Sequence, residues 1–465
     1  MTESNRLGSL RSEIERVTLE IVGLVGLRNS LAEDVAQEKA RLGLPLLNPD
    51  VEKHLRVTVV DKCEDIGVSP AFGVRLLNQL IAESLRVQQK RNESQVAFNA
   101  HDFFVKAKEM ERSGKDVFHL EVGEPDFGPP KTVTDAITNA VCQGLTRYTE
   151  SAGIPSLREK IANQIGSIYQ REVSPEEVIV TVSGKYALFL GVASTIHDGN
   201  EVIIIDPSFP AYSRCVRAVG GSPVHISTHL DDDWNIDVSL VENHINESTK
   251  LILLNSPCNP TGKIVDESTF QELVSLAIEN DIRIVSDEVY SRFSYSPHTS
   301  ILQFPQCSQI TVKSFSKPYG MTGFRLGYAI SDPVTVKTMA NLQHLHVTCA
   351  PEFIQHAGLA ALDCDEEVRR NARTIESRLK STSRLLEGLP VSFKEAEGGF
   401  YIFAKMTEDG MDGQTFAERL LSETGVCVMP GIVYGSKYDS FFRVSVCQPE
   451  EKLAEAIGRM KEVLG

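Results

Sequence analysis

The stretch SFSKPYGMTGFRLGY (residues 314–328) decides how the larger part of this sequence is interpreted. It places Lys317 just after the apolar run QITV (309–312), which has the composition of a buried strand. A glycine-rich bend follows, and then Arg325. Lysine normally lies on a solvated surface. An amine at the end of a buried strand, followed by an arginine, therefore indicates a site for an anionic group.

Short apolar runs alternate with helical patterns from about residue 120 onwards. They are VIVTVS (178–183), EVIIID (201–206), LILLNS (251–256), RIVSDE (283–288), QITVKS (309–314) and RLGYAI (325–330). Most are apolar throughout, as expected for strands buried on both faces of a largely parallel sheet. Such sheets place their sites just beyond the carboxyl ends of the strands. The residues that follow each run are therefore candidate site residues.

Polar residues that together suit one cofactor follow these predicted strands. They are a small-residue bend that opens a helix (Ser183, Gly184, Lys185), an amide (Asn259), a carboxylate (Asp287), a phenol (Tyr290), and two hydroxyls with an amine (Ser314, Ser316, Lys317). Pyridoxal phosphate needs a lysine for its aldehyde, a carboxylate facing its pyridine nitrogen and a cup for its phosphate. Backbone N–H groups at the start of a helix can supply that cup.

The remaining roles follow from the chemistry of the cofactor ring. Asp287 as an anion keeps the pyridine nitrogen protonated, which makes the ring an electron sink. Asn259 and Tyr290 are expected to donate hydrogen bonds to the phenolic oxygen. Phe209, in DPSFPAY (206–212), is expected to stack on the ring, although core packing explains a phenylalanine there equally well without the other residues.

The region from about residue 95 to 465 resembles the class I, fold-type I aminotransferases from end to end. The resemblance rests on LEVGEPDFGPP (120–130), RYTESAGIPSLRE (147–159), NSPCNPTG (255–262), SDEVY (286–290), SFSKPYGMTGFRLGY and PG…FFRVS (430–445) in that order. It implies an α/β fold over residues 93–465. A large domain with a mostly parallel sheet is expected over about 130–355. A smaller α+β domain is expected from 97–129 together with 356–465.

The same resemblance implies roles for individual residues. Lys317 is the Schiff-base lysine, and once released it is the base that moves a proton between the substrate Cα and the cofactor C4′. Ser314, Ser316 and Arg325 hold the cofactor phosphate. Arg443 grips the substrate α-carboxylate, for which a planar guanidinium is suited; Asn259 and the backbone of Gly123 assist. Tyr148 reaches the cofactor phosphate of the partner subunit, so a homodimer is implied.

Residues 8–92 follow a different pattern, with long helical repeats and no convincing strand. Apolar residues alternate at steps of four and three in the first helix: Leu10, Ile14, Val17, Ile21, Leu24, Leu31 and Val35. A second helix is predicted from Pro49 to Ile66 and a third from near Pro70. This spacing predicts a helical bundle, paired with a second copy because so small a core is marginal alone. Polar residues interrupt the seams at Arg28, Ser84 and Gln88, and with Glu52 they indicate a polar cavity, although register control also explains a single polar seam residue.

The N-terminal region resembles the all-helical chorismate mutase domain, and we assign it residues 1–92. The pattern is carried by Arg11, Arg28, Lys39, Glu52, Ser84 and Gln88. In that family, cations hold the two carboxylates of chorismate, and a lysine and a glutamine donate to the ether oxygen as its bond breaks; Lys39 and Gln88 match those positions. PLLNPDVE departs from the family pattern at Asn48 and Val51, where aspartate and arginine are usual. An active mutase and a degenerate, regulatory or merely dimerising bundle both stay open.

Composition excludes several classes of partner. The formal net charge of −16 over 465 residues argues against nucleic acid or an anionic membrane as the main partner. The start MTESNRLGSLRSEIER has no apolar core of a signal peptide, and no apolar run reaches membrane-spanning length. Nine scattered cysteines without a C-x-x-C pair indicate reduced thiols in the cytoplasm and no metal site.

The sequence therefore predicts a fusion of a chorismate mutase with an aminotransferase. The mutase product prephenate leads to phenylalanine and tyrosine, so the fusion favours prephenate, phenylpyruvate or hydroxyphenylpyruvate as acceptor, with glutamate or aspartate as donor. An aspartate aminotransferase with an attached mutase domain stays open. So does another fold-type I chemistry such as β-elimination or decarboxylation. A regulator with an aminotransferase-like sensor would need a basic DNA-binding module at the front, where this acidic chain has a heptad bundle instead.

Overall fold

The computed structural model describes residues 3–42, 49–95, 100–407 and 411–464, and it divides the chain into two compact units, residues 1–98 and 99–465. The residue limits predicted above for the domains remain predictions. No helix within the described ranges combines the length and apolar character needed to cross a membrane.

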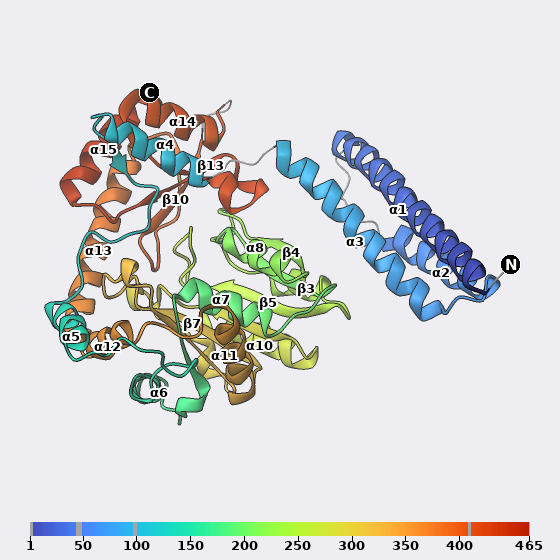
Figure 1. Cartoon of the computed structure of the whole chain (residues 1–465). Coiled ribbons are helices and arrows are strands. Elements are labelled where there is room, and N and C mark those ends of the chain that lie inside the picture. Colours follow the sequence, from blue (N-terminus) through green and yellow to red (C-terminus); the bar gives the residue numbers. More distant parts are fainter. Residues whose placement is uncertain (1–2, 43–48, 96–99, 408–410, 465) are drawn as a thin grey trace. The chain divides into compact units, whose positions relative to one another are not determined.

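The first unit consists of three helices, α1 (Glu3–Leu42), α2 (Pro49–Asp65) and α3 (Pro70–Gln95), and its described residues contain no strand (Figure 1). The second helix thus ends one residue before the predicted end. Gly73 on α3 is in close contact with α2, because a Cβ there would come 2.2 Å from Cys63 Sγ. The helices therefore pack closely at this point.

Helix α1 leaves its predicted seam uncovered within one chain. Of the seven seam residues, all are exposed, from 43% for Val17 to 67% for Ile14. Ala32 and Ala36 are buried instead, and they lie on a different face of the same helix. A single copy of the bundle thus covers only one side of α1.

The second unit is built around a seven-stranded sheet in the order β2-β8-β7-β6-β5-β3-β4. Its strands are β2 (Val178–Thr181), β3 (Glu201–Asp206), β4 (Ser222–Ser227), β5 (Thr249–Asn255), β6 (Arg283–Asp287), β7 (Gln309–Ser314) and β8 (Gly327–Ser331). β8 is antiparallel to both of its neighbours, and the other pairs are parallel. The predicted α/β fold with a mostly parallel sheet is thus confirmed.

Helices cover both faces of this sheet. One face packs on α7 (Gly184–Ala193), α8 (Ala211–Ala218) and α11 (Pro333–Val347), and the other on α9 (Val238–Asn243) and α10 (Glu267–Glu279). Neighbours on β5 alternate between them, since Leu253 belongs to the first core and Ile252 to the second. Burial on both faces explains the continuously apolar runs in the sequence. Helices α5 (Lys131–Cys142), α6 (Pro155–Tyr169) and α12 (Glu352–Ala361) lie near one another (Figure 1) and share a hydrophobic core with β2.

A smaller α+β part joins residues from the start and the end of this unit. Its antiparallel sheet has the order β12-β13-β10-β9, and a separate parallel pair is formed by β1 and β11. The elements are α4 (Ala100–Arg112), β1 (Phe118–His119), α13 (Asp365–Leu386), β9 (Val391–Ser392), β10 (Tyr401–Met406), α14 (Gly413–Thr424), β11 (Val426–Cys427), β12 (Met429–Pro430), β13 (Phe441–Ser445) and α15 (Glu450–Leu464). β1 thus brings the segment after it beside β13.

Candidate active site

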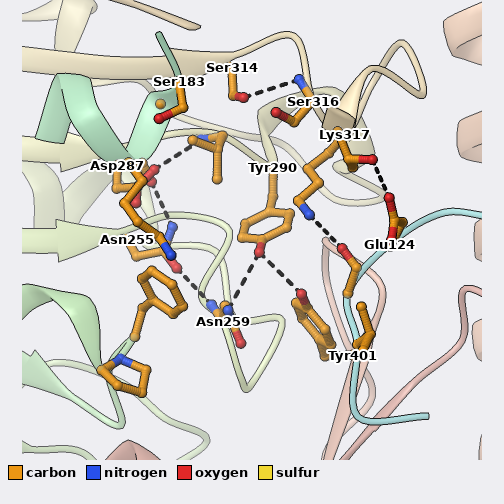
Figure 2. Close-up of a pocket in the computed structure, with 18 of the residues that line it drawn as sticks. Glu124, Ser183, Asn255, Asn259, Asp287, Tyr290, Ser314, Ser316, Lys317 and Tyr401 are labelled. Atoms are coloured by element: carbon orange, nitrogen blue, oxygen red, sulfur yellow. Dashed lines mark hydrogen bonds between the residues drawn. The ribbon is translucent and has the colours of Figure 1, made fainter. Parts of the chain in front are cut away.

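A cavity of about 540 Å³ lies at the carboxyl ends of the central strands. Asn255 ends β5, Asp287 ends β6 and Ser314 ends β7, and all three face it (Figure 2). The predicted residues that line this one cavity are Gly123, Ser183, Gly184, Lys185, Phe209, Asn259, Asp287, Tyr290, Ser314, Ser316, Lys317, Arg325 and Arg443. The fold thus brings together residues spread over more than three hundred positions.

Lys317 follows β7 and directs its amine across the cavity to the segment after β1. Its Nζ donates a hydrogen bond of 2.5 Å to the carbonyl oxygen of Gly123 (Figure 2). Burial lowers the pKa of Lys317 below its ordinary value, and the cations Arg443 and Arg325 act in the same direction. A lowered pKa increases the fraction of neutral amine, which is the form that attacks an aldehyde.

The start of α7 forms a cradle for an anion. Ser183 caps the helix by accepting a hydrogen bond from the backbone N–H of Tyr186 at 3.1 Å. Gly184 and Gly327 let the chains approach, because a Cβ at Gly327 would lie 2.2 Å from the Gly184 nitrogen. Free N–H groups and the positive end of the helix dipole favour a phosphate at this point. Arg325 lies in the left-handed region at φ 55° and adds a cation to the cavity wall.

Asp287 is a buried carboxylate in the cavity. Its Oδ2 accepts a hydrogen bond from the Tyr212 hydroxyl at 2.9 Å, and its Oδ1 accepts one from the Val289 N–H at 3.3 Å. Burial raises the pKa of Asp287 to about 6, although both hydrogen bonds favour the anion. An approaching cation would lower that pKa again. The environment thus suits a carboxylate that faces a protonated ring nitrogen.

Two amides and two phenols that line the cavity are connected by hydrogen bonds. Asn255 Oδ1 accepts from the Asn259 N–H at 2.7 Å, and Asn259 Nδ2 donates to the Tyr290 hydroxyl at 3.4 Å. The Tyr290 and Tyr401 hydroxyls lie 3.2 Å apart (Figure 2). A Cβ at Gly123 would come 1.7 Å from the Tyr401 hydroxyl oxygen, so only glycine fits there.

Arg443 is a buried cation on β13. It donates to Asn259 Oδ1 at 2.9 Å and to the backbone oxygen of Glu121, and its Cζ lies 4.0 Å from the centroid of the Tyr401 ring. Its Nε has no hydrogen-bond partner, and no ion pair found among the described residues involves this guanidinium. Because a buried charge without a counter-ion is costly, Arg443 is poised for an anionic ligand.

These features fit pyridoxal phosphate. The chain around Gly184 is packed so closely that a side chain there would crowd its neighbours, so a ligand at this point meets backbone N–H groups. The buried Arg443 Nε lacks a hydrogen-bond acceptor, which an anionic ligand can supply. The buried Asp287 carboxylate has a raised pKa, so a cation beside it would be stabilising. Phe209 lies at the same cavity, with its ring centroid 5.8 Å from that of Tyr212. Sequence reasoning missed Tyr212 and Tyr401. Tyr212 could have been predicted from the sequence, because it ends the motif DPSFPAY, which also contains Phe209.

Tyr148 is not brought into the cavity by its own chain. Its side chain is 86% exposed, and it is not among the cavity residues. Arg292, two residues after Tyr290, is paired with Asp365 and does not line the cavity. The predicted role of Tyr148 in a partner's site stays a prediction.

The helical unit brings two of the predicted mutase residues together. Arg28 on α1 donates to the Ser84 hydroxyl and to the Leu80 carbonyl on α3. Arg11 is exposed and lies 17 residues earlier on the same helix, about 25 Å along its axis. Lys39 is partly buried on α1. The side chains of Glu52 and Gln88, and Asn48 altogether, lie outside the described residues, and Val51 is exposed.

Comparisons with known families match both units. The family described as "Aminotransferase class I and II" matches residues 115–460, and "Chorismate mutase type II" matches residues 10–89. An aspartate aminotransferase of Pyrococcus abyssi is 34% identical over 358 residues, covering 75% of this chain and 92% of the relative. An aspartate/prephenate aminotransferase of Thermus thermophilus is 36% identical over 387 residues, covering 82% of this chain and 98% of the relative.

Solved structures agree with this. An aspartate aminotransferase from Thermotoga maritima superposes with a TM-score of 0.75 at 33% identity, covering 80% of this chain and 98% of its own. The chain belongs to the aminotransferase class I and II family, and it carries a chorismate mutase type II domain in front. It is thus an enzyme with an aminotransferase and a chorismate mutase domain, as the sequence predicted, and pyridoxal phosphate is the cofactor that this family implies.

Proposed function

We propose that the chain is a bifunctional enzyme of aromatic amino acid biosynthesis. Its helical unit converts chorismate to prephenate, and its larger unit transfers an amino group from glutamate or aspartate to a prephenate- or phenylpyruvate-type keto acid. The observation that carries the second activity is the convergence of Lys317, Asp287 and the unpaired Arg443 on one cavity. The first activity is supported by the family match and by the Arg28–Ser84 contact.

The cofactor, when bound, supplies a ring that takes up the electrons released at the substrate Cα. Asp287 holds the ring nitrogen in its cationic form, and Asn259 and Tyr290 donate to the phenolic oxygen. The bend Ser183–Gly184–Lys185 through its backbone, with Ser314, Ser316 and Arg325, binds the phosphate. Phe209 packs on the ring face. These assignments rest on the shared cavity and on the donor set of its walls.

Arg443 and Lys317 act on the substrate. Arg443 binds the α-carboxylate, for which its Nε is unpartnered, and Asn259 and the Gly123 backbone border the same space. Lys317, once its amine is free, takes the proton from Cα and returns it on the other side of the transfer. Its lowered pKa favours the neutral base.

In the helical unit, catalysis is positioning and charge stabilisation. Arg28 is proposed to hold a chorismate carboxylate together with Ser84, and Lys39 with Gln88 to donate to the ether oxygen. Glu52 completes the polar cavity. Arg11 is too far along α1 to join Arg28 in one chain. It is therefore proposed to complete the site of a second copy.

Two features support a homodimer. The apolar seam of α1 is exposed in one chain and would be buried by a second copy. Tyr148, which the resemblance assigns to the partner's cofactor phosphate, is 86% exposed in its own chain. All nine cysteines are free, which suits the cytoplasm. We place the mutase domain at residues 1–92 and the aminotransferase at 93–465, with its large domain over about 130–355.

The choice of keto acid rests on the fusion and on one cavity residue. The described residues that line the cavity include four cations, Lys185, Lys317, Arg325 and Arg443. Three of them are assigned to the cofactor and the α-carboxylate. The Lys185 ammonium lies 5.1 Å from the Phe209 ring centroid, and we propose that it meets a second carboxylate of the substrate. Prephenate and oxaloacetate carry one, whereas phenylpyruvate does not.

An aspartate aminotransferase with an attached mutase is the second candidate, favoured by the same Lys185 and by relatives of that name. Measuring kcat/KM for prephenate, phenylpyruvate and oxaloacetate with glutamate decides between them. We expect prephenate or phenylpyruvate to be preferred. A hundredfold preference for oxaloacetate over both would assign the second candidate. Loss of chorismate absorbance on mixing with the purified chain tests the mutase in the same preparation.

A further inference from the structure

A buried ion pair lies behind the two strand ends that carry the cofactor residues. Lys313 Nζ lies 2.9 Å from Glu288 Oε2, and the two side chains are only 10% and 0% exposed. Glu288 directly follows Asp287 at the end of β6, and Lys313 directly precedes Ser314 at the end of β7. None of the roles proposed above uses either residue.

Both members of the pair make further hydrogen bonds. The Glu288 carboxylate accepts from the Ser300 hydroxyl at 2.8 Å, from the Ile301 N–H at 3.1 Å and from the Ser286 hydroxyl at 3.2 Å. Lys313 also donates to the Ser291 hydroxyl at 3.1 Å. The titratable groups facing the pair are Asp287, His298, Tyr169 and Tyr328. Burial opposes both charges, but their mutual attraction keeps Lys313 a cation and Glu288 an anion, raising the first pKa and lowering the second.

The position of the pair matters because the sheet ladder stops here. The last paired residues of β6 and β7 are Asp287 and Val312, and the Glu288 N–H donates to the Val312 oxygen at 2.9 Å. Side chains alternate along a strand. Asp287 and Ser314 line the active-site cavity, whereas Glu288 and Lys313 line a second cavity of about 310 Å³, which Ser314 also borders. The pair thus joins the two strand ends beside the last backbone hydrogen bond between β6 and β7.

We propose that Glu288 and Lys313 are positioning residues, which set the separation between Asp287 and the Ser314–Lys317 segment. One rigid cofactor must meet Asp287 with its ring nitrogen and Ser314 with its phosphate at the same time. A shift of one strand end relative to the other would break one of these contacts. The inference rests on the cofactor roles proposed for Asp287 and Ser314.

Stability alone does not account for this pair. Replacing a buried ion pair by apolar residues of similar size is often neutral or stabilising, because both charges must be removed from water. A packed apolar contact could therefore hold the two strands equally well. An ion pair with five hydrogen bonds differs in that it fixes direction and distance.

The test compares cofactor affinity with stability in four variants. Lys313→Met removes the ammonium at similar volume, and Lys313→Arg keeps the charge and can extend into the adjoining cavity. Glu288→Gln keeps the shape and one acceptor oxygen, but it removes the charge and replaces the other oxygen with an N–H donor. Arg171→Met is the matched control, because it removes another mostly buried ion pair, with Glu177, that lies away from the cavity. For each apoprotein, pyridoxal phosphate is titrated to obtain Kd, and Tm is measured without cofactor.

Substitutions at the pair should change the Kd for pyridoxal phosphate and not only the Tm of the apoprotein. Lys313→Met should raise Kd by about tenfold to a hundredfold, the scale on which a misplacement of roughly 1 Å acts, and Lys313→Arg should restore most of the affinity. Arg171→Met should lower Tm and leave Kd unchanged. If Lys313→Met lowers Tm but binds the cofactor as tightly as the wild type, the inference is wrong. If that variant does not fold, Glu288→Gln decides: weaker binding supports the inference and unchanged Kd overturns it. If the wild type itself fails to bind the cofactor, the proposed function fails instead.

Discussion

Replacing Asp287 with asparagine should stabilise the cofactor-free protein while weakening its hold on the cofactor. The carboxylate is buried, with one phenol and one N–H as donors. Burial raises its pKa to about 6 from the ordinary 3.8. Above pH 6 the folded protein therefore contains a charge that would be better hydrated in the unfolded chain. Asparagine keeps the shape and an acceptor oxygen but removes that charge.

The size of the effect follows from the shift in pKa. A rise of about two units corresponds to roughly 3 kcal/mol, at 1.36 kcal/mol for each unit. The sign is that of an acid whose folded pKa is raised: the unfolded chain loses its proton first, so stability falls as pH rises from the unfolded pKa to the folded one. The advantage of Asp287→Asn should therefore grow by about 1 kcal/mol between pH 5 and 7, and then level off.

The assay can isolate the unit concerned. Trp234 is the only tryptophan in the sequence and is buried in the aminotransferase unit, so its fluorescence reports the unfolding of that unit. Guanidinium chloride unfolding of both apoproteins is measured at several values between pH 5 and 8. Protein concentration is held fixed, because association would add to the stability.

Two outcomes would contradict the reasoning about Asp287. A difference in unfolding free energy that is the same at pH 5 and pH 8 would mean that Asp287 is not the titrating group, and the argument from its burial would fail. A variant that bound pyridoxal phosphate as tightly as the wild type would separately remove Asp287 from its role at the ring nitrogen.

Three further substitutions test the other assignments. Lys317→Ala should abolish the visible absorption band of the bound cofactor, while dialysis shows that cofactor still binds through the phosphate cradle; a retained band would mean that another lysine is the anchor. Arg443→Met should reduce kcat/KM for the amino donor by ten- to over a hundredfold, the cost of about 1.5–3 kcal/mol for a charge-assisted contact, and an unchanged value would place the α-carboxylate elsewhere. Arg28→Met should lower mutase turnover of chorismate by a similar factor with unchanged transamination, and equal loss of both activities would indicate unfolding.

Much of the fold could be predicted because strands buried on both faces leave a strong signal. All six predicted runs overlap strands of the central sheet. The strand that was missed, β4, is SPVHIS at the edge of the sheet, where proline and histidine interrupt the apolar pattern. β4 has one partner and only one fully buried residue, so its sequence is less constrained than that of β2, the other edge strand, which is buried throughout.

The site residues likewise fall into those that the sequence predicts and those that it does not. Residues that directly follow a strand, such as Asp287 and Lys317, could be found because chain order and sheet geometry place them together. Tyr401 could not, because it comes from the smaller sheet more than a hundred residues from Tyr290, and no local pattern predicts that the two hydroxyls meet. Contacts between distant segments depend on how the two sheets pack, which the local pattern does not record.

The three charged groups of the site share one physical property: each is held in a state that the folded protein alone does not favour. Asp287 has a raised pKa, Lys317 a lowered one, and Arg443 has a buried Nε without an acceptor. The ligand parts proposed for them are a cation, an aldehyde carbon and a carboxylate, and each relieves one of these penalties. Binding should therefore stabilise the aminotransferase unit by more than the buried contact area alone would give. The unfavourable free energy of these three groups in the empty site is thus recovered when cofactor and substrate bind.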